Sequence, residues 1–149
     1  MIKNRLYVKT VNGIIFDLDL RGRIVLIDGN SGTGKTFLLN TIKNNQLNPV
    51  SLRDNLESDL SDVVTIDVFT KDRINNIKNM SNKLIIIDNA DIILNQDMAN
   101  FISLDKNNQY LIYSRGKNDF HISPNYYAYL ERNCKKISLN YRFSEEGWF

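Results

Sequence analysis

The sequence predicts an α/β protein: a doubly wound, mostly parallel five-stranded sheet flanked by helices, with an N-terminal β-hairpin. Three observations lead to this prediction. Apolar, β-branched segments alternate along the chain with segments of helical periodicity. A glycine-rich motif joins an apolar strand to a helix, and Asn12-Gly13 is a strong hairpin signal between two alternating segments. Strands that alternate with helices favour parallel pairing, because a helical crossover returns the chain to the same end of the sheet.

The individual elements follow from these patterns. Residues 5–11 and 13–20 are predicted to form the hairpin. Helices are predicted after the glycine-rich motif to about residue 45, over 74–80, and over 92–102 with a break near Asn95. Ser123 and Pro124 are typical of the first positions of a helix, which predicts a helix over 123–133. The five core strands are expected to end near Asp28, Phe69, Asp88, Ser114 and Leu139.

Composition places the chain among ordinary globular proteins. Its 149 residues suit a single domain over 1–149, with the leading hairpin in 1–22 and an acidic, aromatic tail in 143–149. Apolar residues make up 42% and the net charge is only +2, which by itself does not indicate nucleic-acid binding. The single cysteine, Cys134, excludes an internal disulfide and is expected on a helix. No signal pattern or membrane-spanning run is evident, so we expect a cytoplasmic protein with no membrane partner.

The glycine-rich motif covers residues 29–36, GNSGTGKT, and matches G-x-x-x-x-G-K-[ST]. Its glycines allow successive backbone N–H groups to curl around phosphate oxygens, and the helix that follows adds its positive end. Lys35 is the candidate to reach the β- and γ-phosphates, and the Thr36 hydroxyl is the candidate Mg²⁺ ligand. The predicted nucleotide-binding residues are Gly29, Asn30, Ser31, Gly32, Thr33, Gly34, Lys35, Thr36 and Phe37.

A second motif is the segment 83–91, KLIIIDNAD. Four consecutive apolar residues that end on Asp88 are typical of a strand buried on both faces, whose carboxyl end faces a ligand crevice. Asp88 is therefore predicted to hold the hydration shell of Mg²⁺ opposite Thr36.

The first motif resembles the Walker A motif of the P-loop NTPases, and the second has the form of a Walker B strand. A further strand between them, at 63–69, resembles the additional-strand ATPases, which include the AAA, ABC and RecA-like families. Neither an ABC signature of the LSGGQ type nor an AAA lid domain is present. The resemblance implies ATP and Mg²⁺ as cofactors. It also implies that Ser114 or Arg115 senses the γ-phosphate, although both equally fit an ordinary strand-ending turn.

The main departure from this family concerns hydrolysis. These ATPases usually place a Glu directly after the Walker B Asp to polarise the attacking water, and here that residue is Asn89. Asp91 and Asp67 are the candidate replacements, but both are shorter than Glu, and a misplacement of about 1 Å can cost roughly a hundredfold in rate. Hydrolysis is therefore expected to be slow alone and to be completed by a partner that supplies an arginine finger.

Three functions are consistent with these residues. The first is a small AAA-like ATPase that acts with a protein partner or as a homo-oligomer. The second is a nucleotide-binding switch with little turnover, which Asn89 favours. The third is a GTPase or small-molecule kinase; Lys117-Asn118-Asp119 follows a strand as a guanine-reading N-K-x-D would, but Gly116 stands in the place of the Asn. Nucleic acid stays open as a partner, because basic residues could gather on the leading hairpin.

Overall fold

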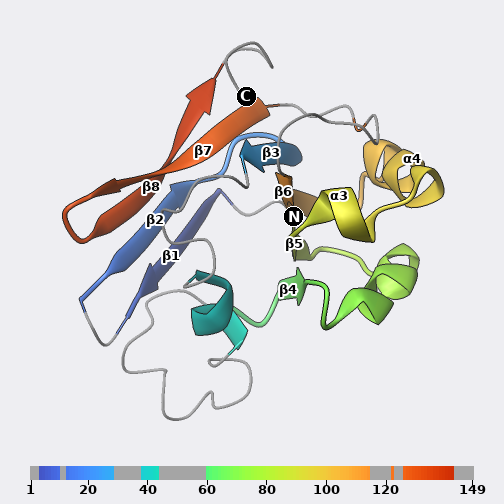
Figure 1. The fold of residues 1–149 in the computed structure, drawn as a ribbon, viewed down its shortest axis with the longest axis horizontal. Helices are drawn as coiled ribbons and strands as arrows, with labels where there is room; N and C mark the ends of the chain where they lie inside the picture. Colours follow the sequence, from blue (N-terminus) through green and yellow to red (C-terminus); the bar gives the residue numbers. More distant parts are fainter. Residues whose placement is uncertain are drawn as a thin grey trace.

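The computed structural model describes residues 4–10, 13–28, 38–43, 60–114, 122 and 126–142. They contain an eight-stranded sheet of order β1-β2-β8-β7-β3-β6-β5-β4 (Figure 1). The described helices are the segment 38–43, the 3₁₀ helix η2 (Lys71–Asn79), α3 (Ala90–Ile93) and α4 (Gln96–Leu104). The strands are β1 (Arg5–Lys9), β2 (Ile15–Asp19), β3 (Ile24–Asp28), β4 (Val63–Ile66), β5 (Leu84–Ile87), β6 (Gln109–Ser114), β7 (Tyr126–Asn133) and β8 (Lys136–Arg142).

The predicted fold class, a doubly wound parallel sheet of five strands, is wrong. The sheet has eight strands of mixed direction and curls into a half-barrel, and strands outweigh helices in the described residues. β7, β3, β6, β5 and β4 pair in parallel, but β8 is antiparallel to β7 and β1 is antiparallel to β2. β2 pairs in parallel with β8, so the leading hairpin extends the main sheet instead of standing apart from it.

The predicted helix over 123–133 is also wrong, because residues 126–133 form strand β7. Burial in β7 has a period of two, with Ala128 and Leu130 buried and Tyr129 between them partly exposed. Tyrosine-rich segments favour strands, and this preference outweighed the helix-start signal of Ser123 and Pro124, which lie outside the described residues. Cys134 consequently lies in an exposed hairpin turn and not on a helix.

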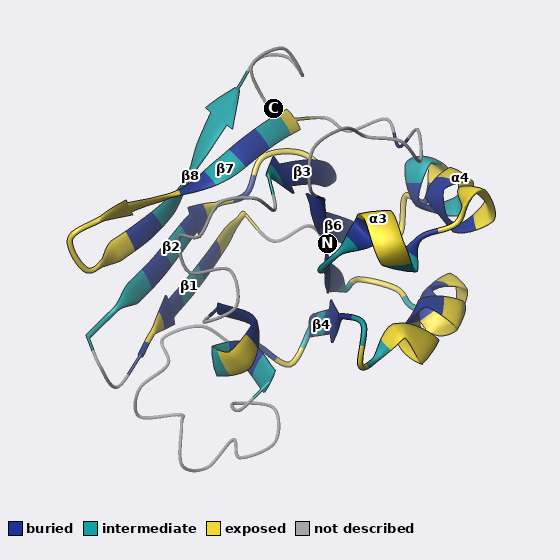
Figure 2. Ribbon diagram, viewed as in Figure 1, coloured by how far each residue is buried: buried dark blue, intermediate teal, exposed yellow. Residues whose placement is uncertain are grey.

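The curl of the sheet encloses the helical segment 38–43. Leu38, Leu39 and Ile42 share one buried cluster with Leu6 of β1 and Val63 of β4, which come from the two opposite edges of the sheet. The sheet must therefore curve around this helix. On the convex face, η2, α3 and α4 cover the other side of the parallel strands in a second buried cluster (Figure 2).

Three further predictions concern the C-terminal tail, the helix break near Asn95 and membrane-spanning segments. The predicted tail at 143–149 lies outside the described residues. The predicted break near Asn95 is confirmed: α3 ends before it, and the Asn95 side chain accepts a hydrogen bond from the Met98 N–H at 2.8 Å to begin α4. Within the described ranges, no helix is long and apolar enough to cross a membrane.

The β7–β8 turn gives a test of this architecture. Cys134 has φ of 58°, a left-handed conformation that side chains disfavour. Cys134→Gly is expected to raise the free energy of unfolding by about 0.5–1 kcal/mol, measured by urea denaturation. Asn133→Gly, one residue earlier within β7, is the matched control and is expected to lower it by a similar amount, because glycine weakens a strand. Equal destabilisation by both variants would contradict the hairpin.

Candidate functional site

Three predicted site residues, Asp67, Asp88 and Ser114, lie at the carboxyl edge of the parallel strands. Asp28 ends β3, and its register partner Ser114 ends β6. Asp67 and Asp88 directly follow β4 and β5, and the Asp88 N–H donates to the carbonyl of Ile66 at 2.8 Å. Parallel pairing thus brings residues that are far apart in sequence to one edge of the sheet.

The two faces of the sheet divide these residues. Side chains alternate along each strand, so Asp67, Asp88 and Tyr113 follow the positions that pack on the concave face, where the segment 38–43 lies. Asp28 and Ser114 follow the positions that pack on the face covered by α3 and α4. The structure therefore groups Asp88 with Asp67, and it places Ser114 beside Asp28 across the sheet.

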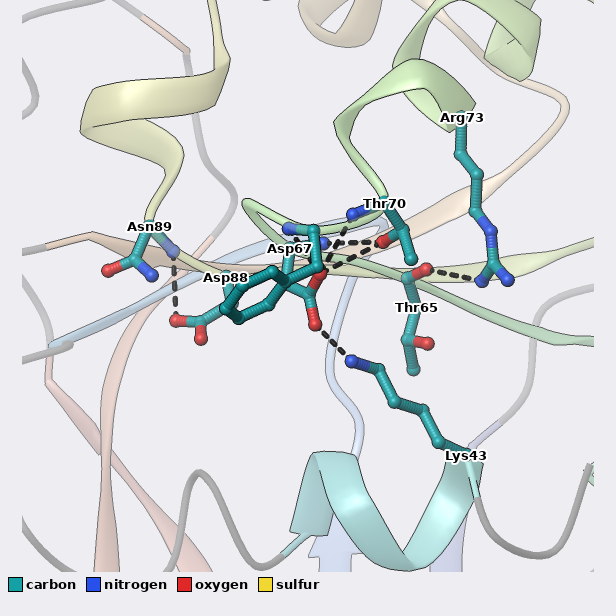
Figure 3. A network of polar contacts seen from close by, with 8 residues as sticks. Lys43, Thr65, Asp67, Thr70, Arg73, Asp88 and Asn89 are labelled. Atoms are coloured by element: carbon teal, nitrogen blue, oxygen red, sulfur yellow. Dashed lines mark hydrogen bonds and ion pairs between the residues drawn. The ribbon is translucent and has the colours of Figure 1, made fainter.

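An ion pair joins the helical segment 38–43 to the end of β4 (Figure 3). Lys43, the last described residue of that segment, donates to Oδ2 of Asp67. Oδ1 of Asp67 accepts from the Phe69 N–H at 2.9 Å, the Thr70 N–H at 3.0 Å and the Thr70 hydroxyl at 3.1 Å. Both carboxylate oxygens are thus occupied, and the turn after β4 is tied to the helix.

These contacts set the charge state of Asp67. Burial by itself raises the pKa of this carboxyl, but the hydrogen bonds from Lys43 and Thr70, the Lys43 charge and the Phe69 N–H together outweigh it. The pKa of Asp67 therefore lies below its ordinary value. At neutral pH the group is an ionised, mostly buried partner of Lys43.

Asp88 lies at the corner where β5 turns into α3. Its Oδ1 accepts from the Asn89 N–H at 2.8 Å, and Asn89 has the left-handed angles φ 51° and ψ 48°, a region that asparagine tolerates better than most residues. Tyr113 is fully buried on the same face. Burial, and secondarily the negative charge of Asp88, raise the pKa of Tyr113, so the phenol stays neutral beside the carboxylate.

Other predicted residues stand apart from this group or lie outside the described residues. Asp91 is exposed in the first turn of α3. Residues 29–37, with Lys35 and Thr36, and Arg115 and 117–119 lie outside the described residues. The nearest described residues on either side of the glycine-rich motif are Asp28, on the carboxyl edge, and residue 38, on the concave face.

Sequence reasoning missed Lys43, Thr70 and Tyr113. For Thr70 a signal existed, because an Asp followed three residues later by Thr is typical of a side-chain-capped turn. Lys43 looks like an ordinary exposed helical lysine, and nothing local predicts its partner 24 residues later. Tyr113 sits in an apolar run whose neighbours on other strands only the fold supplies.

Two further observations concern polar groups in the described residues. Ser114 Oγ is buried and has no hydrogen-bond partner among the described residues. No group of three or more acidic, His or Cys side chains that could hold a metal occurs in the described residues.

Comparisons with known proteins add no relative. No family model matches the chain, and neither a curated protein nor a solved structure matches it. Function is therefore inferred from the two motifs and from the geometry of the carboxyl edge.

The Lys43–Asp67 pair can be tested through stability. Asp67→Asn is expected to lower the free energy of unfolding at pH 7 by about 1–3 kcal/mol, because it removes a charged acceptor from Lys43 and Thr70. Lys43→Met should lower the free energy of unfolding by less in the Asp67→Asn background than in the native chain. Asp91→Asn, at an exposed site, is the matched control and should change little.

The pH dependence gives the sign of the Asp67 contribution. Its folded-state pKa is lowered, so the stabilisation is present above the unfolded pKa of about 4 and is lost as the pH falls through the folded value. The difference in unfolding free energy between the native chain and Asp67→Asn should persist from pH 8 to 5 and narrow below about pH 4. A difference that stays constant down to pH 2.5 would show that the ion pair contributes nothing.

Proposed function

We propose that the chain binds ATP with Mg²⁺ at the carboxyl edge of its parallel strands and hydrolyses it slowly, as a small AAA-like ATPase that acts with a protein partner or as an oligomer. One observation carries this proposal. The phosphate-binding motif starts where β3 ends, between β7 and β6, and the chain then continues in a helix on the face of the sheet where Asp88 lies. A glycine-rich loop between a strand and a helix is the context that its phosphate-binding chemistry requires.

The proposed roles follow from the chemistry of each side chain. Backbone N–H groups of 29–36 and the Lys35 ammonium would hold the phosphates, and Thr36 and Asp88 would hold the metal from opposite sides. Bound Mg²⁺ would neutralise charge that develops on the phosphate oxygens during transfer.

A nucleotide-binding switch with little turnover is the second candidate, and the placement of the carboxylates favours it. Asn89 occupies the position of the usual Glu. Asp67 is held by Lys43 and Thr70 and would have to give up that pair to polarise water. Of the two candidates to replace the Glu, this leaves Asp91, which is exposed on α3. Its short side chain predicts weak activation of the attacking water.

Nucleotide binding is the first test of this proposal. The native chain is expected to bind ATP in the presence of Mg²⁺, measured by calorimetry, with GTP titrated in parallel. Lys35→Ala should abolish binding, whereas Asp88→Asn should remove most of its dependence on Mg²⁺. A tighter affinity for GTP would support the GTPase alternative, and absence of binding to either nucleotide would overturn the proposal.

Phosphate release separates the ATPase from the switch. Slow release that rises with protein concentration would support an assembling ATPase, and binding without release would support the switch. In the first case Asp91→Asn is expected to reduce the rate at least tenfold while ATP affinity stays unchanged. Asp97→Asn, on exposed α4, is the matched control. Equal rates for both variants would exclude Asp91 as the residue that positions water.

A further inference from the structure

The convex face of β1, β2, β8 and β7 carries no described helix. η2, α3 and α4 all lie over the parallel strands at the other end of the sheet (Figure 1). In this four-stranded part, the alternate side chains that point into the curl, such as Leu6, Phe16 and Ile137, are buried. The residues between them point outward and form a half-exposed sheet face rich in Tyr, Arg and Lys.

Two tyrosines on this face lie under arginine side chains. The Arg5 guanidinium lies 4.6 Å from the ring centre of Tyr7, and that of Arg142 lies 4.6 Å from the ring centre of Tyr129. The Tyr129 hydroxyl also accepts from Asn140 Nδ2 at 2.7 Å, which fixes the ring. Tyr7 on β1 and Tyr129 on β7 are separated by three strand spacings, roughly 14 Å. One extended ligand could therefore contact both planar stacks.

Two exposed cations of this face lie above a less exposed acid. Asp17 lies beneath Arg5, at 2.7 and 2.9 Å, and Lys136, at 3.6 Å. The side chains of Arg5 and Lys136 are 59% and 60% exposed, whereas that of Asp17 is only 19% exposed. The acid thus holds the two cations in place without presenting its own charge to a ligand.

Charge is also divided between the two halves of the sheet. In 5–9, 15–21 and 126–142, basic side chains outnumber acidic ones by seven to three. In 60–114, which supplies β4, β5 and β6, five basic side chains face seven acidic ones. The small net charge of the whole chain conceals this asymmetry, which would orient a polyanion toward the four-stranded half.

From this arrangement we propose that the convex face of β1, β2, β8 and β7 binds single-stranded nucleic acid. Bases stack on Tyr7 and Tyr129 or on the guanidinium planes above them, and phosphates pair with Arg5, Lys136 and Arg142. Single strands suit this face because their bases are free to stack on aromatic and guanidinium planes, whereas the bases of a duplex are already stacked on each other. The proposal does not depend on ATP binding, since the carboxyl-edge site lies on the other half of the sheet.

The test uses the full chain and fluorescein-labelled dT and rU 12-mers, with anisotropy measured at 50 and 200 mM salt without nucleotide. Tyr7→Leu with Tyr129→Leu is expected to weaken binding at least tenfold, because each base–aromatic stack contributes about 1–3 kcal/mol. Tyr126→Leu is the matched control, because Tyr126 projects to the opposite face, where its ring meets Tyr141. Arg5→Gln with Lys136→Gln should reduce the salt slope by roughly 1.4.

Comparing the affinities for the two 12-mers and for a DNA duplex identifies the kind of nucleic acid that binds. Equal affinity for the two 12-mers would support a shared single-strand chemistry, and a preference for rU would identify RNA as the ligand. Binding of a DNA duplex as tight as that of dT, equal loss in Tyr126→Leu, or no anisotropy change at micromolar protein would each overturn the proposal. Arg142→Gln provides a second measurement if the tyrosine variants do not fold, and it is expected to weaken binding and to lower the salt slope by roughly 0.7.

Discussion

The packing of the short helix 38–43 inside the curl of the sheet is the constraint on which the rest of the structure depends. Its apolar residues share one buried cluster with residues of strands from both edges, so the hydrophobic effect that buries them also favours the curvature of the sheet. Burial of a leucine-sized side chain contributes about 1.5–3 kcal/mol, and three such side chains are concentrated in six residues. The Lys43–Asp67 pair then fixes the helix relative to β4, and through the pairing of β4 with β5 it fixes the helix relative to Asp88.

The sequence revealed the strands well and the sheet poorly, for a physical reason. Segments such as 84–87 are apolar on both faces, and this composition predicts an interior strand directly. Strand order and direction depend instead on contacts between distant residues, for which the chain carries no local signal. The segment 126–133 is an example. If it is predicted to be a helix, the sheet has only five parallel strands. As strand β7 it pairs with β8, which in turn pairs with β2 and so joins the leading hairpin to the main sheet.

Some residues of the candidate site could likewise be predicted from the local sequence, and others could not. The position of Asp88 was predictable, because an acidic residue that follows a buried parallel strand lies at the carboxyl edge of the sheet. Lys43 and Tyr113 were not, since their importance comes from neighbours that the fold brings to them. The structure also adds information that residue spacing cannot give. Asp67 and Asp91 looked equivalent as replacements for the missing Glu, but one is held in an ion pair and the other is exposed.

The mixed sheet also provides two kinds of surface, of which a doubly wound sheet, with helices on both faces, would provide only the first. Parallel pairing collects strand ends, and with them Asp67, Asp88 and Ser114, at one edge. Antiparallel pairing of β7 with β8 and of β1 with β2 leaves a face without a described helix over it, because hairpin connections need no crossover helix to cover them. Among the described residues, the convex face of β1, β2, β8 and β7 instead carries arginine, lysine and tyrosine side chains. β3, which pairs with β6 on one side and β7 on the other, is the strand through which the two halves are mechanically joined.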